Sequence, residues 1–510
     1  MAVFSERERR FLTAVAGLGY GNPFLPERIA HERAALGKEF VDGGPVWSAS
    51  VTDPDSTPPN ITSVYRKLNE QREALRARLA AATDCHQDEL RIYEESVHYL
   101  LYQRYHRDFV GARGKWAFYR SFLADWEKYC HIPGKPFASV LEPAHVFACY
   151  RQIQHAFHHI YDNIIGNSMP AARLRASIWQ SIFSHDMRRY RRTLYAKMGE
   201  FPTLITGPSG TGKELIARAI AGSRYIAFDP ERMTFADPPG ESFVPINVSA
   251  LSPTLIESEL FGHRRGAFTG AIGDRKGWLE ACPSTGSVFL DELGEMDLSI
   301  QVKLLRVIET RKFSAVGDTA EREFKGKLIA ATNRDLEKEI RAGRFREDLY
   351  YRMCADLIQT PSLADQIQDT PAVLHELLHY MTLRTVGKEA DECLPEVEAW
   401  IRAHLPGSYA WPGNYRELEQ CVRNVIIRQS YRPLQQPAVS ADDDFFARFR
   451  AGDLTADQVL AAYAARVYRM SGSYEEAARK MGLDRRTVKA KVEAYLSNPT
   501  SISPSAPREN

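Results

Sequence analysis

A glycine-rich segment near the middle of the chain has the residue types that bind phosphate. An apolar run at residues 201–205 precedes it, and a run of helical composition at residues 214–220 follows it. This order predicts a strand, a phosphate-binding loop and a helix. Glycines let backbone N–H groups converge on an anion, the positive end of the helix points at the same place, and Lys213 adds a charge for the outer phosphates. The loop residues are Gly207, Pro208, Ser209, Gly210, Thr211, Gly212, Lys213 and Glu214.

One position departs from the general pattern of such loops. Glu214 stands where Ser or Thr normally holds Mg²⁺. Two interpretations stay open at this point: the loop binds its metal through other residues, or the protein binds a nucleotide without hydrolysing it. A glycine turn beside a surface lysine is the weakest interpretation, because both the strand and the helix are in place.

A pair of carboxylates follows the apolar run at residues 288–290. In an α/β sheet the site lies at the carboxyl ends of the strands, where Asp291 and Glu292 would stand. Asp291 is predicted to hold Mg²⁺, and Glu292 to act as the base that orients an attacking water. An acidic pair alone says little, but downstream of a phosphate-binding loop it supplies the metal ligand that Glu214 does not.

Two further sets of polar residues fit the same site. Thr332 and Asn333 end the next apolar run, where they can sense a γ-phosphate. Arg346 and Arg352 follow, and an arginine that reaches a phosphate from a neighbouring subunit raises the rate by about 10³–10⁵. Salt bridges on a helix surface are the alternative for both arginines.

The segments that must position these residues alternate between strand and helix from residue 201 to about residue 360. This is the layout of an α/β doubly wound domain with a parallel sheet. A polar excursion at residues 223–241 precedes the second strand. The candidate strands are Phe201–Ile205, Phe243–Val248, Val288–Leu290, Leu328–Ala331 and Asp356–Gln359.

The region before this domain is predicted to be helical. Apolar residues recur at helical spacing in residues 65–79, 90–109 and 146–165. Two pairs share a helix face and could hold a metal, but we favour surface or satisfied histidines because only one Glu-x-x-His is present. The pairs are Glu95 with His98 and His155 with His159.

Six arginines lie between this helical region and the phosphate-binding loop. We favour a solvated helix that leads into the next domain, and contact with the nucleotide or with a neighbouring subunit is the alternative. The arginines are Arg173, Arg175, Arg188, Arg189, Arg191 and Arg192.

The composition is that of a soluble, folded protein. The 510 residues are 44% apolar and 26% charged, which predicts two to four domains. The net charge of +1 indicates no global electrostatic partner, so nucleic-acid binding would need a local patch. Seven cysteines without a CxxC pair predict reduced thiols in a cytoplasmic protein, and no apolar run reaches the length of a membrane helix.

The stretch at residues 257–271 has an unusual composition between the second and third strands. One aromatic residue, Phe268, stands among small residues with glycine on both sides. Two glycines would cost a core helix about 1 kcal/mol each. The composition therefore favours a mobile loop that presents Phe268 and Thr269 outward.

Residues 175–430 resemble the AAA+ domain of the sigma-54-dependent transcriptional activators, the bacterial enhancer-binding proteins. The Gly-Ala-Phe-Thr-Gly-Ala loop is highly specific to that family, and glutamate after the loop lysine is the family's usual form. The motifs that carry the resemblance are Gly207–Glu214, Glu257–His263, Gly266–Ala271, Phe289–Leu293, Ala331–Asp335 and Trp411–Leu418. Two segments depart from it, residues 363–366 after the fifth strand and the long excursion at residues 223–241.

The resemblance implies an ATPase that uses ATP and Mg²⁺ and assembles as a homo-oligomeric ring, usually a hexamer. The loop at residues 266–271 would push on the sigma-54 RNA polymerase holoenzyme, and ATP turnover would open the promoter. Asn247 would hold Glu292 in check, and Arg416 would be a second sensor on the lid. The residues implied are Asp291, Glu292, Asn247, Arg346 and Arg352 for catalysis, Thr332, Asn333 and Arg416 for sensing, and Gly266, Ala267, Phe268, Thr269, Gly270 and Ala271 for contact with the client.

The C-terminal segment has the pattern of a helix-turn-helix. Helices are predicted for residues 456–470, 474–481 and 484–496, with Gly482 in the turn and Asp484 as the N-cap of the third helix. The segment resembles a Fis-type DNA-binding domain, and a small bundle with a solvated basic face is the alternative. The basic residues predicted to meet DNA are Arg485, Arg486, Lys489 and Lys491.

These patterns predict a multidomain transcription factor with a helical N-terminal region, an AAA+ domain with a helical lid, and an all-α reader. The predicted divisions are a regulatory region at 1–170, the α/β subdomain at 171–365, the lid at 366–432, a linker at 433–452, the helix-turn-helix at 453–497 and a disordered tail at 498–510. Two rivals stay open: an AAA+ remodeller of another client, and a non-enzymatic DNA-binding regulator that only binds nucleotide.

Overall fold

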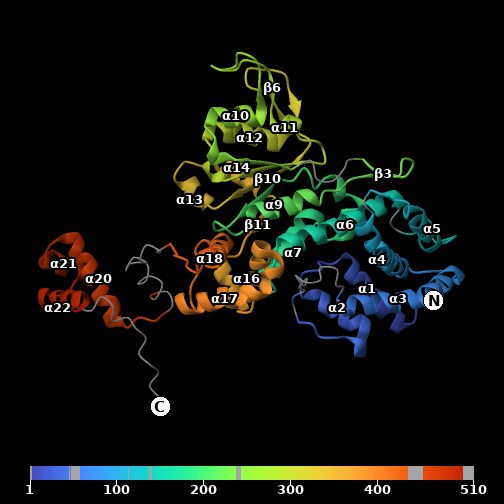
Figure 1. The fold of residues 1–510 in the computed structure, drawn as a ribbon, viewed down its shortest axis with the longest axis horizontal. Helices are drawn as coiled ribbons and strands as arrows, with labels where there is room; N and C mark the ends of the chain where they lie inside the picture. Colours follow the sequence, from blue (N-terminus) through green and yellow to red (C-terminus); the bar gives the residue numbers. More distant parts are fainter. Residues whose placement is uncertain are drawn as a thin grey trace. The chain divides into compact units, whose positions relative to one another are not determined.

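The computed structural model describes residues 3–44, 46, 58–112, 114–135, 137, 141–236, 243–434, 449 and 452–497. The chain divides into two compact units, Met1–Tyr431 and Arg432–Asn510. The first unit contains an N-terminal group of helices, an α/β subdomain and a helical lid (Figure 1).

The N-terminal group is helical, as predicted, and its core is aromatic. The ring of Phe147 lies 4.9 Å from that of Tyr119 and 5.3 Å from that of Phe122, measured between centroids. The predicted ranges 65–79 and 90–109 fall within α3 and α4, and the range 146–165 overruns α6, which ends at Asn163. The helices are α1 (Glu6–Tyr20), α2 (Glu27–Leu36), α3 (Pro59–Ala81), α4 (Gln87–Gly111), α5 (Tyr119–Cys130) and α6 (Pro143–Asn163).

The α/β subdomain is built on a five-stranded parallel sheet, and all five predicted strands are confirmed. The strand order is β11-β1-β10-β7-β4. Every residue of the central strand β10 is buried, as expected for a parallel strand covered on both faces. The strands are β1 (Thr203–Thr206), β4 (Phe243–Asn247), β7 (Ser287–Asp291), β10 (Lys327–Thr332) and β11 (Leu357–Gln359).

Helices and short strand pairs surround this sheet. The helices are α9 (Lys213–Gly222), α10 (Pro253–Phe261), α11 (Trp278–Ala281), α12 (Leu298–Thr310), α13 (Leu336–Arg341) and α14 (Glu347–Met353). The short antiparallel pairs are β2 (Phe228–Asp229) with β3 (Thr234–Phe235), β5 (Gly262–His263) with β6 (Arg275–Lys276), and β8 (Lys312–Phe313) with β9 (Arg322–Glu323).

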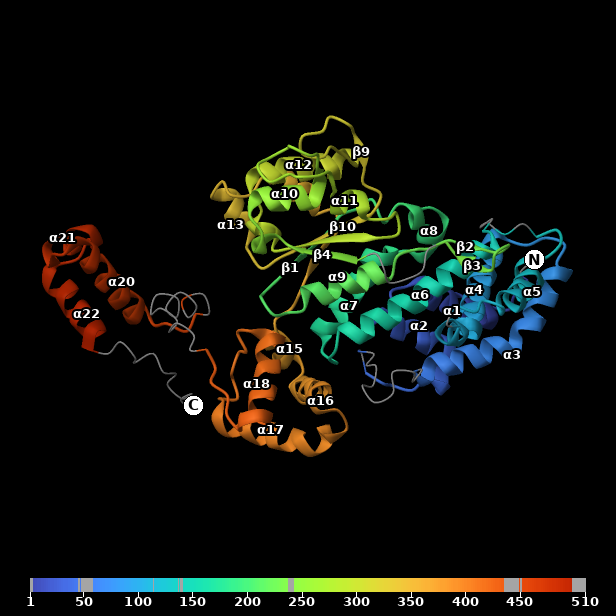
Figure 2. The same ribbon diagram turned by 45° about the horizontal axis from the view of Figure 1, so that its top comes forward.

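The polar excursion predicted at residues 223–241 contains the β2–β3 hairpin, and this hairpin packs on the N-terminal helices (Figure 2). The ring of Phe228 lies 4.8 Å from that of Phe147. The guanidinium of Arg151 lies 4.2 Å from the centre of the Phe235 ring. The N-terminal helices and the α/β subdomain therefore share a hydrophobic core.

The segment between α6 and β1 forms α7 (Met169–Phe183) and α8 (Met187–Arg192). The prediction of a solvated helix is wrong for two of its arginines, since Arg175 and Arg191 are only 2% and 5% exposed. Arg191 forms a buried ion pair with Glu95 of α4, with 2.6 Å between Nη2 and Oε2. The arginines at 173, 189 and 192 are exposed as expected. The predicted boundary between residues 170 and 171 lies inside α7.

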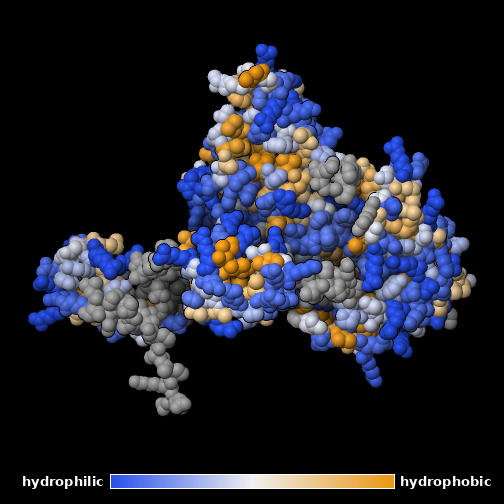
Figure 3. Space-filling model, in the orientation of Figure 1, coloured by the Kyte–Doolittle hydropathy of each residue, from blue (hydrophilic) through white to orange (hydrophobic). Residues whose placement is uncertain are grey.

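The lid is a group of helices with its own apolar core. It begins within the 363–366 segment, where Ser362 and Asp365 form a capping box that starts a helix. The helices are α15 (Leu363–Asp369), α16 (Val373–Val386), α17 (Ala390–His404) and α18 (Asn414–Arg428). In Figure 3, apolar colouring gathers over the α/β subdomain and over the lid. None of the described helices is both long and apolar enough to cross a bilayer.

Residues 452–497 of the second unit form three helices, close to their predicted positions. Thr455 and Gln458 form a capping box at the start of the first helix, and Gly472 and Gly482 take left-handed conformations in the two turns. The helices are α20 (Ala456–Ser471), α21 (Tyr474–Met481) and α22 (Arg485–Ser497). The predicted linker at 433–452 lies largely, and the predicted tail at 498–510 entirely, outside the described residues.

Candidate functional site

The glycine-rich loop joins β1 to α9 at the carboxyl edge of the sheet. Gly207, Gly210 and Gly212 all have positive φ angles, of 141°, 77° and 83°, which other residues rarely adopt. A Cβ at Gly207 would lie 2.0 Å from Oγ1 of Thr360 and 2.8 Å from its carbonyl oxygen. Glycine is required there both for its conformation and for the close approach of the segment after β11.

Lys213 is held within this loop. Its Nζ donates to the carbonyl oxygens of Gly207, at 3.0 Å, and of Pro208, at 2.9 Å. Burial lowers the pKa of Lys213, and the nearby carboxylates of Glu292 and Asp291 oppose that shift. The ammonium is therefore positioned, partly dehydrated, where an anion in the loop would meet it.

The two carboxylates at the end of β7 lie beside the loop. Burial raises the pKa of Asp291. Glu292 has a φ of 57°, a strained conformation for a residue with a side chain. Its Oε2 is buried and finds no hydrogen-bond partner among the described residues. An unpartnered buried carboxylate oxygen at a site is chemically suited to bind a water or an ion.

Asn247 lies next to this pair in the sheet but does not bond to it here. Its Cα pairs with that of Asp291 in the β4–β7 register. The side-chain oxygen of Asn247 instead accepts from the backbone N–H and the hydroxyl of Ser249, at 2.9 and 2.8 Å. No hydrogen bond links Asn247 to Glu292 among the described residues, so the implied restraint on Glu292 is not formed in this conformation.

The lid closes over the glycine-rich loop through the start of α18. The side-chain amide of Asn414 donates to the carbonyl of Ser209 at 2.9 Å, and the backbone N–H of Tyr415 donates to the carbonyl of Gly210 at 3.1 Å. Arg416 reaches the hydroxyl of Ser209 at 3.4 Å. The predicted second sensor therefore does lie at the loop.

A cleft of about 380 Å³ opens between these parts, within the size range of small-molecule sites. One end is polar and contains the loop and the carboxylates. The other end is formed by the α6–α7 connection and the lid, and it is called the apolar end here because Ile164, Ile165, Leu377 and Met381 line it, beside polar side chains such as Arg384. The lining residues are Asn163, Ile164, Ile165, Leu174, Ser209, Gly210, Thr211, Gly212, Lys213, Glu214, Leu215, Arg218, Asp291, Glu292, Pro361, Gln366, Leu377, Tyr380, Met381, Arg384, Tyr415, Arg416 and Glu419.

Sequence reasoning missed the apolar end of this cleft. Residues 163–165 fall in the predicted regulatory region, and Leu377, Tyr380 and Met381 come from a lid helix more than 200 residues later. They carry no motif, because apolar residues on helices look alike whether they face a core or a ligand. A phosphate end and an apolar end in one cleft fit a nucleotide, with its phosphates in the loop and its base between α6–α7 and α16.

The Gly266–Ala271 loop lies between β5 and β6, and its residues are not among those that line the cleft. Residues 257–261 are the last turns of α10, so the prediction of a loop from residue 257 is wrong for its first part. Phe268 is half-buried, with its ring 5.0 Å from that of His263, whereas Thr269 is exposed as predicted. Ile272, just beyond the loop, is 87% exposed.

Ion pairs brace the base of this loop. The guanidinium of Arg264 contacts Asp274 at 2.6 Å and Asp318 at 2.9 Å. Inside the loop, the N–H of Gly266 donates to the carbonyl of Ala271 at 2.9 Å. Asp318 belongs to the segment between β8 and β9, so Arg264 ties two neighbouring loops together.

A sequence profile described as "Sigma-54 interaction domain" matches residues 183–359. This part of the chain is thus similar to the sigma-54 interaction domain. The chain is 41% identical over 237 residues to a Nif-specific regulatory protein of Azotobacter vinelandii, covering 46% of this chain and 42% of that protein. It is 39% identical over 266 residues to the luminescence regulatory protein LuxO of Vibrio campbellii, covering 50% and 54%. The chain thus spans about half the length of the curated relatives it matches.

Among solved structures, the chain is similar to NtrX from Brucella abortus in complex with ADP. The two share 23% identity with a TM-score of 0.39, over 74% of this chain and 80% of that one. The predicted family is confirmed by the profile and the relatives, and the predicted AAA+ α/β fold with its helical flanks agrees with the observed elements. The resemblance of the C-terminal segment to Fis-type domains stays a prediction.

Within the sigma-54 interaction domain, the predicted sensors and fingers occupy different places. Thr332 is buried at the end of β10, and its hydroxyl accepts from the N–H of Arg334 at 3.1 Å, whereas Asn333 is exposed. Arg346 pairs with Asp348 at 2.6 Å and Arg352 with Glu309 at 3.1 Å. Neither arginine is among the described residues that line the cleft.

Outside the sigma-54 interaction domain, the basic residues of α22 are exposed or half-exposed, and three of them form ion pairs near the surface. Arg485 lies 3.4 Å from Glu475, and Lys489 lies 3.7 Å from Glu493. Lys491 pairs with Asp457 of α20 at 3.0 Å. Asp484 accepts from the N–H groups of residues 486 and 487 at 2.9 and 3.0 Å, so the predicted N-cap is present.

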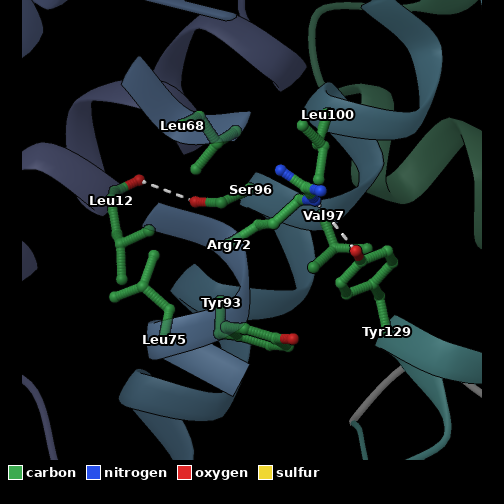
Figure 4. A pocket seen from close by; sticks show the side chains of 9 residues that line it. All are labelled: Leu12, Leu68, Arg72, Leu75, Tyr93, Ser96, Val97, Leu100 and Tyr129. Atoms are coloured by element: carbon green, nitrogen blue, oxygen red, sulfur yellow. Dashed lines mark hydrogen bonds between the residues drawn. The ribbon is translucent and has the colours of Figure 1, made fainter. Parts of the chain in front are cut away.

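The N-terminal helices contain a small cavity whose lining is shown in Figure 4. Its volume is about 10 Å³, which is room for about one water molecule and far too little for an organic effector. Its residues are Leu12, Leu68, Arg72, Leu75, Tyr93, Ser96, Val97, Leu100 and Tyr129.

The histidine pairs of this region behave as the favoured interpretation expected. Glu95 is used by Arg191, and Nδ1 of His98 lies 3.1 Å from the hydroxyl of Tyr150. Burial lowers the pKa of His155 to about 3. Across the part of the chain that the structure describes, no three candidate metal ligands gather.

Proposed function

We propose that this protein is an ATPase that uses the energy of hydrolysis to remodel the closed complex of sigma-54 RNA polymerase and so activate transcription. Nucleotide would bind in the cleft with its phosphates in the glycine-rich loop. The sigma-54 interaction domain supports the partner, and the chemistry of the cleft supports the enzymatic activity.

The observation that carries the enzymatic part is the acidic pair beside the loop. A protein that only binds nucleotide has no need of a strained glutamate with a free, buried oxygen next to the phosphate site. Glu292 has both properties, which fit a base that orients and deprotonates a water. Lys213 is held ready for the outer phosphates, and Arg416 approaches the loop from the lid.

The residues present also fit Mg²⁺. Asp291 would hold the ion, because its carboxylate lies at the cleft beside the loop and oxygen ligands suit this metal. Bound Mg²⁺ supplies charge neutralisation of the phosphates. Glu214 would not be needed as a ligand, since it already pairs with Arg218 at 2.7 Å.

The proposed working form is a homo-oligomeric ring, a hexamer by resemblance to the family. Arg346 and Arg352 both belong to the segment that forms α14, away from this chain's own cleft. The neighbouring Tyr351 is 67% exposed, and α12, which packs on α14, exposes Leu298 and Val302. Exposed apolar side chains beside two arginines suit a surface that meets the cleft of another copy.

The remaining parts complete the proposal. The loop at residues 266–271 would contact sigma-54, α22 would bind DNA upstream of the promoter through its basic residues, and residues 1–170 would sense a signal or restrain the ATPase. We propose the same domain divisions as the sequence predicts and a cytoplasmic location.

The test is the substitution Glu292→Gln, with Glu295→Gln as the matched control. Glu295 is exposed, stands three residues away and pairs with Arg334. We expect E292Q to bind ATP but to hydrolyse it about 10²–10⁴-fold more slowly, and therefore to lose promoter opening. E295Q should behave as the unaltered protein. Promoter activation that survives without hydrolysis would favour a regulator that only binds nucleotide, and unchanged hydrolysis by E292Q would contradict the proposed base.

A further inference from the structure

The apolar end of the cleft has one wall that is not part of any regular element. Residues 164–168 run between α6 and α7, and Ile164 and Ile165 face the cleft together with Asn163 and Leu174. A connection without secondary structure needs other groups to fix its backbone. Arg175 supplies hydrogen-bond donors that fix this backbone.

Arg175 holds this wall from the side of α7. Its Nε and Nη2 donate to the carbonyl of Ile164 at 3.0 and 2.8 Å, and Nη2 also donates to that of Gly166 at 2.7 Å. Its guanidinium lies 5.3 Å from the centre of the Tyr161 ring. Arg175 is 2% exposed, and burial lowers its pKa. A charged donor in this environment makes strong bonds that lock the carbonyls it meets.

The lid holds the same connection from the other side. The side-chain amide of Asn167 donates to Glu376 of α16 at 2.7 Å, and the N–H of Met169 donates to Asp369 of α15 at 2.9 Å. Gly166 has a φ of 108°, and a Cβ there would lie 2.8 Å from Cγ2 of Val373. The wall is therefore set between a buried guanidinium and the lid.

We propose that Arg175 is a positioning residue for the nucleotide base: it fixes the Ile164–Ile165 wall so that a purine can pack between this wall and the apolar residues of α16. This deepens the proposed ATPase function and rests on it. The described contacts of Arg175 are with Ile164, Gly166 and Tyr161, and none of them is with the glycine-rich loop or the acidic pair. Its loss should therefore weaken binding of the base and leave the chemical step unchanged.

The experiment compares three variants, Arg175→Lys, Arg175→Gln and Arg175→Met, in the full chain. Lysine keeps the charge but cannot make the forked contact to two carbonyls, and methionine keeps length without donors. The matched control is Arg173→Gln, an exposed arginine on the same helix. The measurements are KM and kcat for ATP and for GTP, and competition by inorganic triphosphate, which has no base.

We expect each Arg175 variant to raise KM for ATP by about tenfold or more, the size of one lost charge-assisted hydrogen bond. We expect kcat to stay within about twofold, the preference between ATP and GTP to narrow, and competition by triphosphate to be unchanged. R173Q should match the unaltered protein in all four measurements.

Two results would overturn the proposal. One is an unchanged KM in folded variants. The other is unfolding of all three variants, seen by circular dichroism, since this would assign Arg175 a general structural role. If the unaltered protein itself does not hydrolyse ATP, the proposed function fails, and calorimetric ATP binding by the same variants still decides whether Arg175 positions the base.

Discussion

The cleft and the Gly266–Ala271 loop are held in place in opposite ways. The cleft depends on buried contacts between distant segments, such as Gly207 against Thr360 and Asn414 on Ser209. The loop depends on short-range backbone bonds and on exposed ion pairs of Arg264. Exposed ion pairs contribute about 0–1 kcal/mol each, whereas breaking a packed contact costs several times more.

This difference fits a machine that turns hydrolysis into movement. The site of chemistry must keep its geometry to within fractions of an ångström, so it is built from packed and buried groups. In the proposed function, the loop that contacts sigma-54 must change position at low cost, which suits a segment held by groups whose bonds water can replace.

The largest effect should come from removing an arginine that acts on another copy's cleft. We expect Arg346→Ala to lower ATP hydrolysis by about 10³–10⁵ while the variant still binds ATP, because this arginine is remote from its own cleft. Mixing R346A protomers with E292Q protomers should restore activity, since some junctions then combine an intact base with an intact arginine. A mixture no more active than its parts would show that Arg346 does not act between copies.

A matched pair of glycines compares the two regions directly. A Cβ at Gly210 would lie 2.2 Å from the carbonyl of Gly413, whereas one at Gly270 would meet nothing within 4 Å, and both have positive φ. We expect Gly210→Ala to separate the lid from the loop and to reduce ATP affinity by more than tenfold. Gly270→Ala should add only the strain of a left-handed alanine, about 1–2 kcal/mol. Calorimetric ATP binding and melting temperature check both, and equal losses would contradict the contrast.

Truncation of the aromatic side chain in the loop should impair promoter opening without impairing ATP hydrolysis. We expect Phe268→Ala to keep ATP hydrolysis within about twofold, because Phe268 is not among the described residues that line the cleft, and to lose most promoter opening in an assay with sigma-54 holoenzyme. Ile272→Ala, at the exposed position just past the loop, is the comparison variant. Full promoter opening by F268A would favour an AAA+ remodeller of some other client.

The smallest effect should come from the ion pairs below the loop. We expect Arg264→Gln to leave the urea midpoint of unfolding nearly unchanged, and any shift to shrink further in high salt, because the side chain of Arg264 is 47% exposed. Urea unfolding at two salt concentrations measures this. A loss of several kcal/mol would mean that the loop is fixed as firmly as the cleft.

The phosphate end of the site was predictable because its residues are close together in sequence. The strand, the glycines and Lys213 form one local unit, and Asp291 and Glu292 follow one strand directly. Asn247 was assigned to this site only through the family resemblance, and the structure places it beside Asp291 because β4 pairs with β7. The bond of Asn247 to Ser249 did not follow, because a rotamer depends on neighbours that no motif specifies.

The sequence by itself determined the order of strands and helices along the chain, the sigma-54 interaction domain and the glycine-rich loop with its acidic pair, since each depends on spacing along the chain or on a motif. Only the tertiary structure decided that residues 163–165 line the cleft and that the β2–β3 hairpin completes the N-terminal core. It also decided that Arg175 and Arg191 are buried. The physical reason is that burial depends on which surfaces meet, and these surfaces come from segments that are far apart in the chain.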